Sequence, residues 1–547
     1  MQDKETMARN QDPNVELEAW DDDASSEDAF GPDAPLTSST AYQTTTTPKW
    51  FGGRGRTART SLTLRRLRDR ILRRRFFLVP WVAVLLVLFS SYALLCLLRG
   101  TPMFISPLPA YTGPYAVGTM DIEVPLDKPQ HIRKGVVFRA DAEPAFDLET
   151  VLFTLYYPIS PGEHTSAPPH LWFPRPISVI AEGYAKLAHI NFFFTRPLFT
   201  FVLWALAGSI TIPGEVDAPL LDSDEHDGSW QRFPVMVFSH GMASRRNDYS
   251  NYLGEMASRG RVVAAIEHRD GSCPGTLIKI NKQPDRKLLS FGEADVFSEP
   301  PLDKDQLQQA ALAFRDAEIF QTIKVLKSIN DGSGAAIYAS NSRNEGSSLA
   351  GWADRLDFNH LVIGGHSFGA TGALQALNGA PSKENPAIGG IILDPGKSSG
   401  PLNANVSVPV LVVHSNSWSK KHSLFYGRPH FDTVRDLVSD VMHRTGASWF
   451  VTSLGTSHPS VTDAPLLEPT LLSWTTGSSI DVKEGLKEYV RIAGDFFNHI
   501  LKGNGTGVLA QGVTHPEYGQ WVSEERKAEF PEDLAKYWEV HVSPVGA

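Results

Sequence analysis

The 547-residue sequence has few cysteines, no surplus of positive charge and no internal repeat. Two cysteines, Cys96 and Cys273, are too few for a disulfide-stapled scaffold or a cysteine-based zinc site. The formal net charge of -10 argues against a nucleic-acid-binding protein. The composition, 42% hydrophobic and 20% charged residues, is that of a globular protein with a sizeable core.

The first 75 residues differ from the rest of the chain. Residues 1–50 are acidic, rich in Ser, Thr, Asp and Pro, and lack apolar periodicity, so they offer too little surface to bury. Ten arginines then lie between Arg54 and Arg75. We expect residues 1–75 to form a disordered cytosolic tail, acidic first and arginine-rich afterwards.

An uncharged run of 23 residues, Phe76 to Leu98, follows the arginines. As a helix it reaches roughly 34 Å, enough to cross a bilayer core of about 30 Å. A buried core helix is the alternative, but it leaves the arginine cluster unexplained. Arginines before the span, with Arg99 alone just after it, favour a single-pass anchor with residues 99–547 lumenal or extracellular. Glycosylation sequons at Asn405 and Asn504 are compatible with that side.

Short apolar, β-branched runs alternate with helical patterns after residue 232. Such runs suit strands covered on both faces, so the pattern predicts an α/β fold with a doubly wound, mostly parallel sheet. We expect an earlier run, Phe153 to Pro158, to be an antiparallel edge strand, and residues 271–301 and 331–348 to be surface loops. The predicted parallel strands are Val235–Phe238, Val262–Ile266, Leu361–Gly364, Ile388–Leu393, Val410–Val413 and Trp449–Leu454.

A G-x-S-x-G motif, Gly365 to Gly369, follows one predicted strand directly and precedes a helical pattern. This is the context of a nucleophile elbow, the strand-to-helix turn that exposes the serine of an α/β hydrolase. The alternative is a serine packed in a glycine-rich turn. We predict that Ser367 is the nucleophile.

A serine nucleophile requires a base and an orienting acid. Asp394 ends a predicted strand, so its carboxylate is expected at the sheet edge near Ser367, although an Asp-Pro turn explains the same residue. After the next strand, the commoner position for the acid, no carboxylate occurs before Asp432. His458 follows the last predicted strand and is the expected base. The alternative is a surface histidine without a catalytic role. His366, inside the elbow, is expected to support it.

The oxyanion of an acyl-transfer intermediate needs two backbone N–H donors. The residue after the nucleophile, Phe368, supplies one. The other is expected from Met242, in the His-Gly turn that follows the strand ending at Phe238.

The segments Phe238 to Ser272, GGHSFGATGAL, LDPG and GTSHPSVTD resemble the platelet-activating-factor acetylhydrolase family over roughly residues 115–500. The resemblance implies a calcium-independent phospholipase A2-type esterase, with no cofactor and no metal, that removes short or oxidised sn-2 acyl chains from phospholipids. It assigns the triad to Ser367, Asp394 and His458. The tail and the anchor depart from the secreted members, and divergent loops leave acyl and head-group preference open.

A second apolar segment, Ala188 to Ile210, is interrupted by Arg196 and Pro197 and is therefore not expected to span a membrane. The resemblance implies an interfacial element here, with lipid contact near Phe199 and Trp204. A helix packed on the sheet is the alternative.

Two other functions stay open. A general carboxylesterase or lipase would use the same triad on non-phospholipid esters. An inactive hydrolase domain would act as a membrane scaffold, although it has no need of a complete triad. The sequence does not indicate the oligomeric state.

Overall fold

The computed structural model describes residues 84–85, 87–92, 94–96, 98, 105–222, 232–420 and 423–546. The predicted tail lies outside these residues, as does part of the predicted span Phe76 to Leu98. Among the residues described, no helix combines the length and apolarity that crossing a bilayer requires. The chain divides into two compact units, residues 1–86 and 87–547. The folded domain described below belongs to the second unit.

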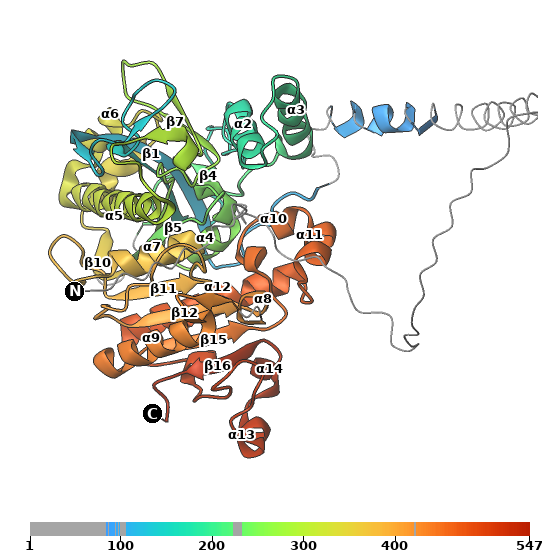
Figure 1. Cartoon of the computed structure of the whole chain (residues 1–547), viewed down its shortest axis with the longest axis vertical. Helices are drawn as coiled ribbons and strands as arrows, with labels where there is room; N and C mark the ends of the chain where they lie inside the picture. Colours follow the sequence, from blue (N-terminus) through green and yellow to red (C-terminus); the bar gives the residue numbers. More distant parts are fainter. Residues whose placement is uncertain are drawn as a thin grey trace, which may run out of the picture. The chain divides into compact units, whose positions relative to one another are not determined.

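A ten-stranded sheet forms the centre of the domain (Figure 1). Its six central strands run parallel to one another, whereas the pairings β15–β16, β6–β3 and β3–β1 are antiparallel. The mostly parallel α/β sheet predicted from the sequence is therefore confirmed. Across the sheet the strands are β16 (Trp538–Val542), β15 (Trp449–Ser453), β12 (Val410–Ser415), β11 (Gly389–Leu393), β10 (Leu356–His366), β5 (Phe233–Ser239), β6 (Val262–Ile266), β3 (Asp147–Ile159), β1 (Ala116–His131) and β4 (Glu215–Val216).

Both faces of the central strands are buried, because alternate residues of each strand enter different cores. In β5, Val235 and Val237 belong to one apolar cluster, and Met236 and Phe238 to another. This double burial explains why β6 and the middle of β5 are wholly apolar.

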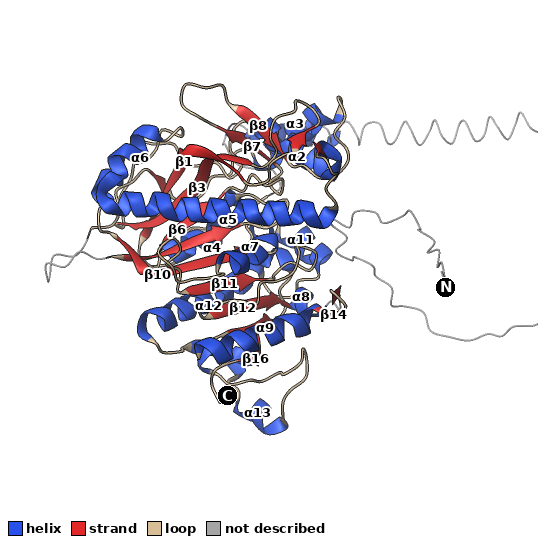
Figure 2. Cartoon of the chain, turned by 60° about the vertical axis from the view of Figure 1, so that its left-hand side comes forward, coloured by secondary structure: helices blue, strands red, loops and turns tan. Residues whose placement is uncertain are grey.

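Helices cover both faces of the sheet (Figure 2). Apolar residues of α5, α7 and α9 pack in the first cluster, and those of α4 and α12 pack in the second. The long helix α5 begins with a reciprocal cap, in which the Asp303 and Gln306 side chains accept each other's backbone N–H. These helices are α4 (Ser250–Ala257), α5 (Lys304–Ser328), α7 (Phe368–Ala376), α9 (His430–Thr445) and α12 (Val482–Lys502).

Some expectations were wrong. The segment Phe153 to Pro158 is antiparallel as predicted, but it lies in β3, which pairs with both β6 and β1 and is not an edge strand. The two expected loops hold a hairpin of β7 (Gly275–Ile278) and β8 (Arg286–Leu289), and the short helix α6 (Gly334–Ser340). The pairing of β3 depends on β1, a strand that local sequence pattern does not reveal.

Two further helices, α2 (Ile177–Leu187) and α3 (Thr195–Ala207), pack against each other beside the sheet (Figure 1). Helix α2 buries six residues, whereas α3 buries only Ala207. The segment predicted to be interfacial therefore contains a helix that leaves Leu198, Phe201, Val202 and Trp204 exposed.

Candidate active site

Ser367 stands between the end of β10 and the first residue of α7, in a backbone conformation of φ 57° and ψ -123°. The turn is tight: a Cβ atom on Gly365 would lie 2.2 Å from the Gly369 carbonyl oxygen, and one on Gly369 would lie 2.1 Å from that of Ser239. The Ser367 N–H donates to the Leu393 carbonyl, 2.9 Å away, which ties the turn to β11. This is the geometry of a nucleophile elbow.

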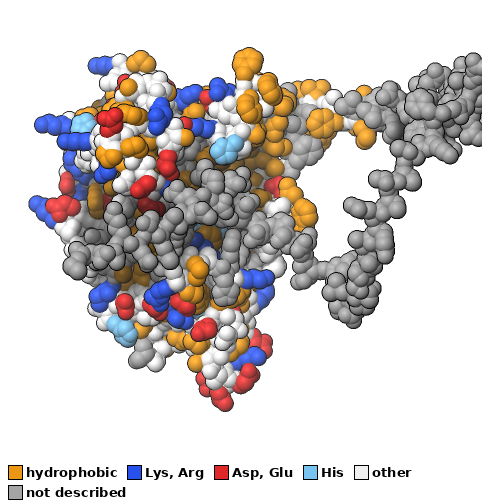
Figure 3. Space-filling model, viewed as in Figure 1, with side chains coloured by type: hydrophobic (Ala, Val, Ile, Leu, Met, Phe, Trp, Pro, Cys, Tyr) orange, Lys and Arg blue, Asp and Glu red, His pale blue; other side chains and the backbone are white. Residues whose placement is uncertain are grey.

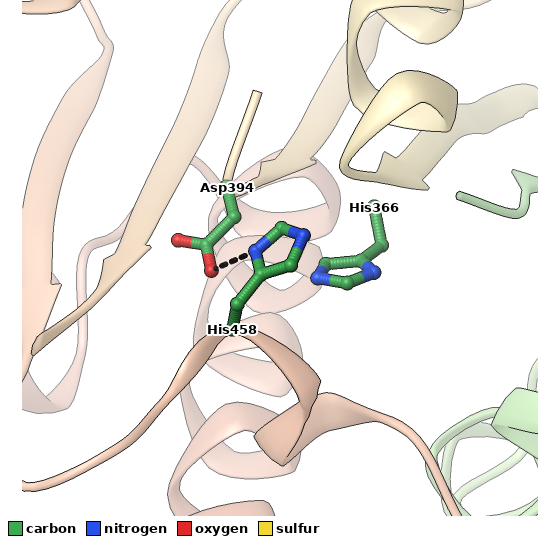
Figure 4. A group of neighbouring side chains, drawn as sticks. All are labelled: His366, Asp394 and His458. Carbon is green, nitrogen blue, oxygen red and sulfur yellow. Dashed lines mark hydrogen bonds and ion pairs between the residues drawn. The ribbon is translucent and has the colours of Figure 1, made fainter. Parts of the chain in front are cut away.

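Asp394 and His458 meet beside this turn (Figure 4). Asp394 directly follows β11 and has a φ of 47°. His458 begins a short helical turn after β15, and its Nδ1 lies 2.9 Å from Asp394 Oδ2. Neighbouring parallel strands deliver their carboxyl ends to one edge of the sheet, which is why residues far apart in sequence converge here.

The Asp394 carboxylate is buried and fully engaged. Its Oδ1 accepts the Ser415 N–H at 2.6 Å, and its Oδ2 accepts the Ser415 hydroxyl at 2.7 Å as well as the His458 ring. The His458 backbone is held by the Ser417 hydroxyl at 3.0 Å. With Nδ1 bound to Asp394, Nε2 is the ring nitrogen that remains for Ser367. Among the described residues, Ser367 Oγ forms no hydrogen bond with His458, a bond that often tightens only in the substrate complex.

Two aromatic rings enclose the His458 imidazole. Trp418 stacks on it with the planes 11° apart, and the His366 ring centroid lies 4.5 Å away. His366 is buried, and its Nδ1 bonds Tyr249 Oη at 2.9 Å. Burial, together with the neighbouring His458, holds the pKa of His366 well below its usual value, so this ring is neutral. His366 therefore supports the site rather than supplying its base.

The same side chains also have the spacing of a metal site. His366, Asp394 and His458 have donor atoms within 4.8 Å of one another, a spacing that a cation site requires. Both Asp394 oxygens, however, accept N–H or O–H bonds from protein groups. The set is arranged for orienting an imidazole and not for coordinating an ion.

Both predicted oxyanion donors lie beside the elbow. A Cβ atom on Gly241 would lie 3.1 Å from Ser367 Cβ, so the loop that carries Met242 lies directly against Ser367. The N–H groups on either side of Met242 are occupied: Gly241 donates to Tyr249 Oη at 3.1 Å and Ala243 to the Ser272 carbonyl at 2.8 Å. In the part of the chain that the structure describes, no acceptor pairs with the N–H of Met242 or with that of Phe368 at the start of α7.

Sequence patterns did not reveal several contributors. Ser415 is the last residue of β12, Trp418 lies in the short helix α8 (Asn416–Lys420) that follows, and Tyr249 reaches the elbow from a different part of the chain. A serine at the end of an apolar strand was the one local signal for Ser415.

The mostly parallel sheet, the strand-to-helix turn at Ser367 and the adjoining Asp394–His458 pair fit an α/β-hydrolase fold. Residues 105–504 match the family model described as platelet-activating factor acetylhydrolase, isoform II. Because this match covers most of the chain, the protein belongs to that family.

Individual relatives are distant. A Schizosaccharomyces pombe protein named "Putative phospholipase A2" is 28% identical over 48% of this chain and 57% of its own length. The platelet-activating factor acetylhydrolase of Bos taurus is 26% identical over 50% and 52%, respectively. The chain thus spans about half the length of the curated relatives it matches. A solved ferulic acid esterase from Streptomyces cinnamoneus aligns with a TM-score of 0.48 and 15% identity, over 75% of this chain and 97% of that one, a likeness too low to bear on activity.

Proposed function

We propose that this protein is a calcium-independent serine esterase of the phospholipase A2 type. Its substrates would be phospholipids with an acetyl, short or oxidised sn-2 chain, such as 1-alkyl-2-acetylglycerophosphocholine. The observation that carries the proposal is the strained Ser367 beside the Asp394–His458 pair, facing a loop with an unoccupied N–H. Membership of the family supports the choice of ester.

The proposed reaction uses only groups of this chain. Ser367 Oγ attacks the sn-2 carbonyl carbon while His458 Nε2 takes the hydroxyl proton, and Asp394 stabilises the resulting imidazolium. The Met242 and Phe368 N–H groups stabilise the negative oxygen. The ester C–O bond breaks, His458 protonates the departing lysophospholipid oxygen, and an acyl-enzyme remains. Water, deprotonated by His458, then releases the fatty acid and restores Ser367.

An exposed apolar surface supports access from a membrane. Figure 3 shows apolar side chains gathered over the α3 side of the domain, and Figures 1 and 2 place α11 (Pro469–Thr476) on the same side. Trp204 is exposed, whereas Phe199 is half-buried. Phe193, Phe194 and Leu198 are more exposed than either. The large exposed apolar residues are Phe192, Phe193, Phe194, Leu198, Phe201, Val202 and Trp204 at α3, and Leu471 and Trp474 on α11. Such a surface fits a lipid interface.

The proposed location rests on the sequence alone. In this proposal Phe76 to Leu98 anchors the protein, with the N-terminus cytosolic and the catalytic domain lumenal or extracellular. Asn405 and Asn504 are both exposed, as glycan acceptors must be. A mobility shift after glycosidase treatment, lost in the double Asn→Gln variant, would support this side; an unglycosylated protein in a secretory host would count against it.

The test uses the full chain in detergent, with Ser367→Ala as the matched control and EDTA present throughout. Acetate and long-chain fatty acid release are measured from phosphatidylcholines that differ only in the sn-2 chain. We expect Ser367-dependent acetate release with little long-chain release. Activity on simple esters alone would favour a general carboxylesterase. No activity from a folded protein would favour the scaffold.

A further inference from the structure

The His240 side chain lies directly behind the loop that carries Met242. His240 follows β5, is fully buried, and bonds through both ring nitrogens. Nδ1 lies 2.8 Å from the carbonyl oxygen of Gly241, and Nε2 lies 3.0 Å from the backbone nitrogen of His268. A backbone N–H can only donate, so Nε2 is the acceptor and Nδ1 carries the proton. The His240 ring therefore donates to Gly241.

The protonation state agrees with this assignment. Burial, reinforced by the nearby Arg315 charge, lowers the pKa of His240 to about 4. The ring is accordingly neutral at physiological pH, with a single proton whose position the His268 N–H determines.

The bond to Gly241 fixes the direction of the next N–H. The Gly241 carbonyl and the Met242 N–H belong to one planar peptide unit, and in a trans peptide they point in opposite directions. Holding the carbonyl on the His240 side therefore aims the Met242 N–H to the opposite side. Met242 itself is not anchored within the described residues, whereas Gly241 and Ala243 are.

A buried arginine holds His240 and reaches the second donor. Arg315 Nη1 donates to the His240 carbonyl at 2.6 Å, and Nη2 donates to Ser272 Oγ at 2.6 Å, the residue whose carbonyl accepts the Ala243 N–H. The guanidinium carbon also lies 4.3 Å from the centre of the Phe368 ring. One side chain thus contacts the segments that carry both N–H donors.

The charge of Arg315 is balanced within the same cluster. Its Nε pairs with Asp270 Oδ2 at 2.6 Å, and its Nη1 also donates to Ser239 Oγ at 3.0 Å. Ser239 bonds His268 Nε2 at 2.7 Å, and His268 Nδ1 bonds Glu318. Ser239, His268 and Glu318 resemble a serine–histidine–acid relay, but they are almost completely buried, so no substrate reaches them. Their effect is to fix the strand ends on which His240 depends.

We propose that His240 is a positioning residue that aims the Met242 N–H at the negative oxygen formed during catalysis, through its Nδ1–H bond to the Gly241 carbonyl, with Arg315 holding His240 in place. This inference rests on the proposed esterase function. It predicts that the nitrogen facing Gly241 governs turnover, and that the nitrogen facing His268 does not.

Two substitutions separate the two nitrogens. In His240→Asn the side-chain amide lies near the former Nδ1 and retains a donor for Gly241; in His240→Gln it lies near the former Nε2 and retains the contact with His268. We expect Asn to keep kcat within about 5-fold of wild type. We expect Gln to lower kcat by ~10²-fold or more, the usual effect of losing one oxyanion donor, with KM within about 3-fold.

The measurements use the full chain, a soluble short-chain ester and thermal unfolding as a check of folding. Inhibition by a trifluoromethyl ketone, which forms an oxyanion on adding Ser367, should weaken in the Gln variant by the same factor as kcat/KM.

Arg315→Lys should lower kcat by about 10-fold at unchanged KM. Arg269→Lys is the matched control, since Arg269 is a buried, ion-paired arginine whose side chain contacts Glu123 and Thr150 and not this loop. It should lose stability but keep kcat.

Equal kcat values for the Asn and Gln variants, or a more active Gln variant, would overturn the role of His240. A loss expressed only in KM or in thermal stability would do the same. If Gln does not fold, Arg315→Lys decides: unchanged kcat and unchanged ketone inhibition would overturn the inference. A folded wild type without Ser367-dependent turnover would instead overturn the proposed function.

Discussion

Trp418 lies flat against the imidazole of His458, with ring centroids 4.0 Å apart and planes 11° apart. Two hydrogen bonds hold Trp418 in place. Its indole Nε1–H donates to the Pro395 carbonyl at 3.0 Å, and its backbone N–H donates to the Ser415 hydroxyl at 3.3 Å. Pro395 follows Asp394 in the chain, and Ser415 donates two hydrogen bonds to the Asp394 carboxylate. Trp418 therefore contacts the proposed base and also the residues that hold the proposed acid. A π face opposite an imidazolium favours the charged ring that the reaction forms.

Removing this ring should slow turnover. We expect Trp418→Ala to lower kcat on a soluble ester by roughly 5- to 30-fold, since about 1–2 kcal/mol of imidazolium stabilisation and ring orientation is lost. Trp418→Phe keeps an aromatic face and should retain most of kcat. Steady-state kinetics of the two variants test this; an Ala variant as fast as the Phe variant would show that the stack has no role in turnover.

Asp394→Asn should preserve the fold and nearly abolish activity. An asparagine places an N–H₂ group among three donors, the two of Ser415 and that of His458, so the imidazole loses its orientation. The expected loss in kcat is on the order of 10⁴-fold. Asp432→Asn is the matched control, because Asp432 is the next carboxylate along the chain and lies on α9. An Asp394→Asn variant with near-normal kcat would assign the acid elsewhere.

The apolar surface should matter only for aggregated substrate. Phe193→Asp and Trp204→Asp place charges on exposed positions of the α3 surface, and we expect at least about 10-fold slower hydrolysis of phospholipid vesicles. Rates on a soluble ester should stay within about 2-fold. Val522→Asp is the control, an exposed apolar residue next to α13 (Glu524–Glu529) and away from α3 (Figure 1). Equal losses on both substrates would contradict a lipid-binding role.

Asp316 should make stability depend on pH. Burial raises the pKa of this α5 carboxyl to about 7, and one bond, from Gln375 at 2.7 Å, opposes the rise only in part. Its Oδ1 is buried without a partner. Because the folded protein binds the proton more tightly than the unfolded chain, the stability contributed by the protonated form falls as the pH rises from about 4 to about 7.

Asp316→Asn mimics the protonated form. It should have little effect near pH 4, and its stabilising effect should grow by at most ~1.4 kcal/mol per pH unit up to about pH 7 and stay constant above that pH. Urea unfolding of both proteins at several pH values measures the difference. The exposed Asp440→Asn should show none. A constant difference across the range would mean that Asp316 does not titrate in this window.

The sequence predicted the features that depend on short contiguous stretches of residues. The central strands are short apolar runs because both of their faces are buried, and the elbow is a contiguous motif. Asp394 and His458 were found because the carboxyl ends of parallel strands meet at one edge, so a residue that ends such a strand is a candidate without any knowledge of contacts. Their assigned roles remain predictions until variants are measured.

Other features depend on contacts between distant segments. Strand β1 carries the buried polar residues Thr119 and Glu123, so its pattern does not resemble that of a core strand. Glu123 pairs with Thr150 and Arg269, which lie elsewhere in the chain. The stacking of Trp418 on His458 and the bonds of Arg315 to His240 join side chains with no periodic relation in sequence. The predicted tail and much of the membrane anchor lie outside the described residues, and they remain predictions as well.

The positive φ angles of Ser367 and Asp394 lower the stability of the folded protein at the two positions where the proposed activity needs a side chain. A non-glycine residue in such a conformation costs roughly 1–3 kcal/mol, and only glycine is free of that cost. Glycine, however, carries neither a hydroxyl nor a carboxylate. A lineage selected for heat resistance alone would gain by replacing Ser367 with glycine, because the Asp394 carboxylate is needed by the three groups that donate to it. It would end as a more stable protein without its proposed nucleophile.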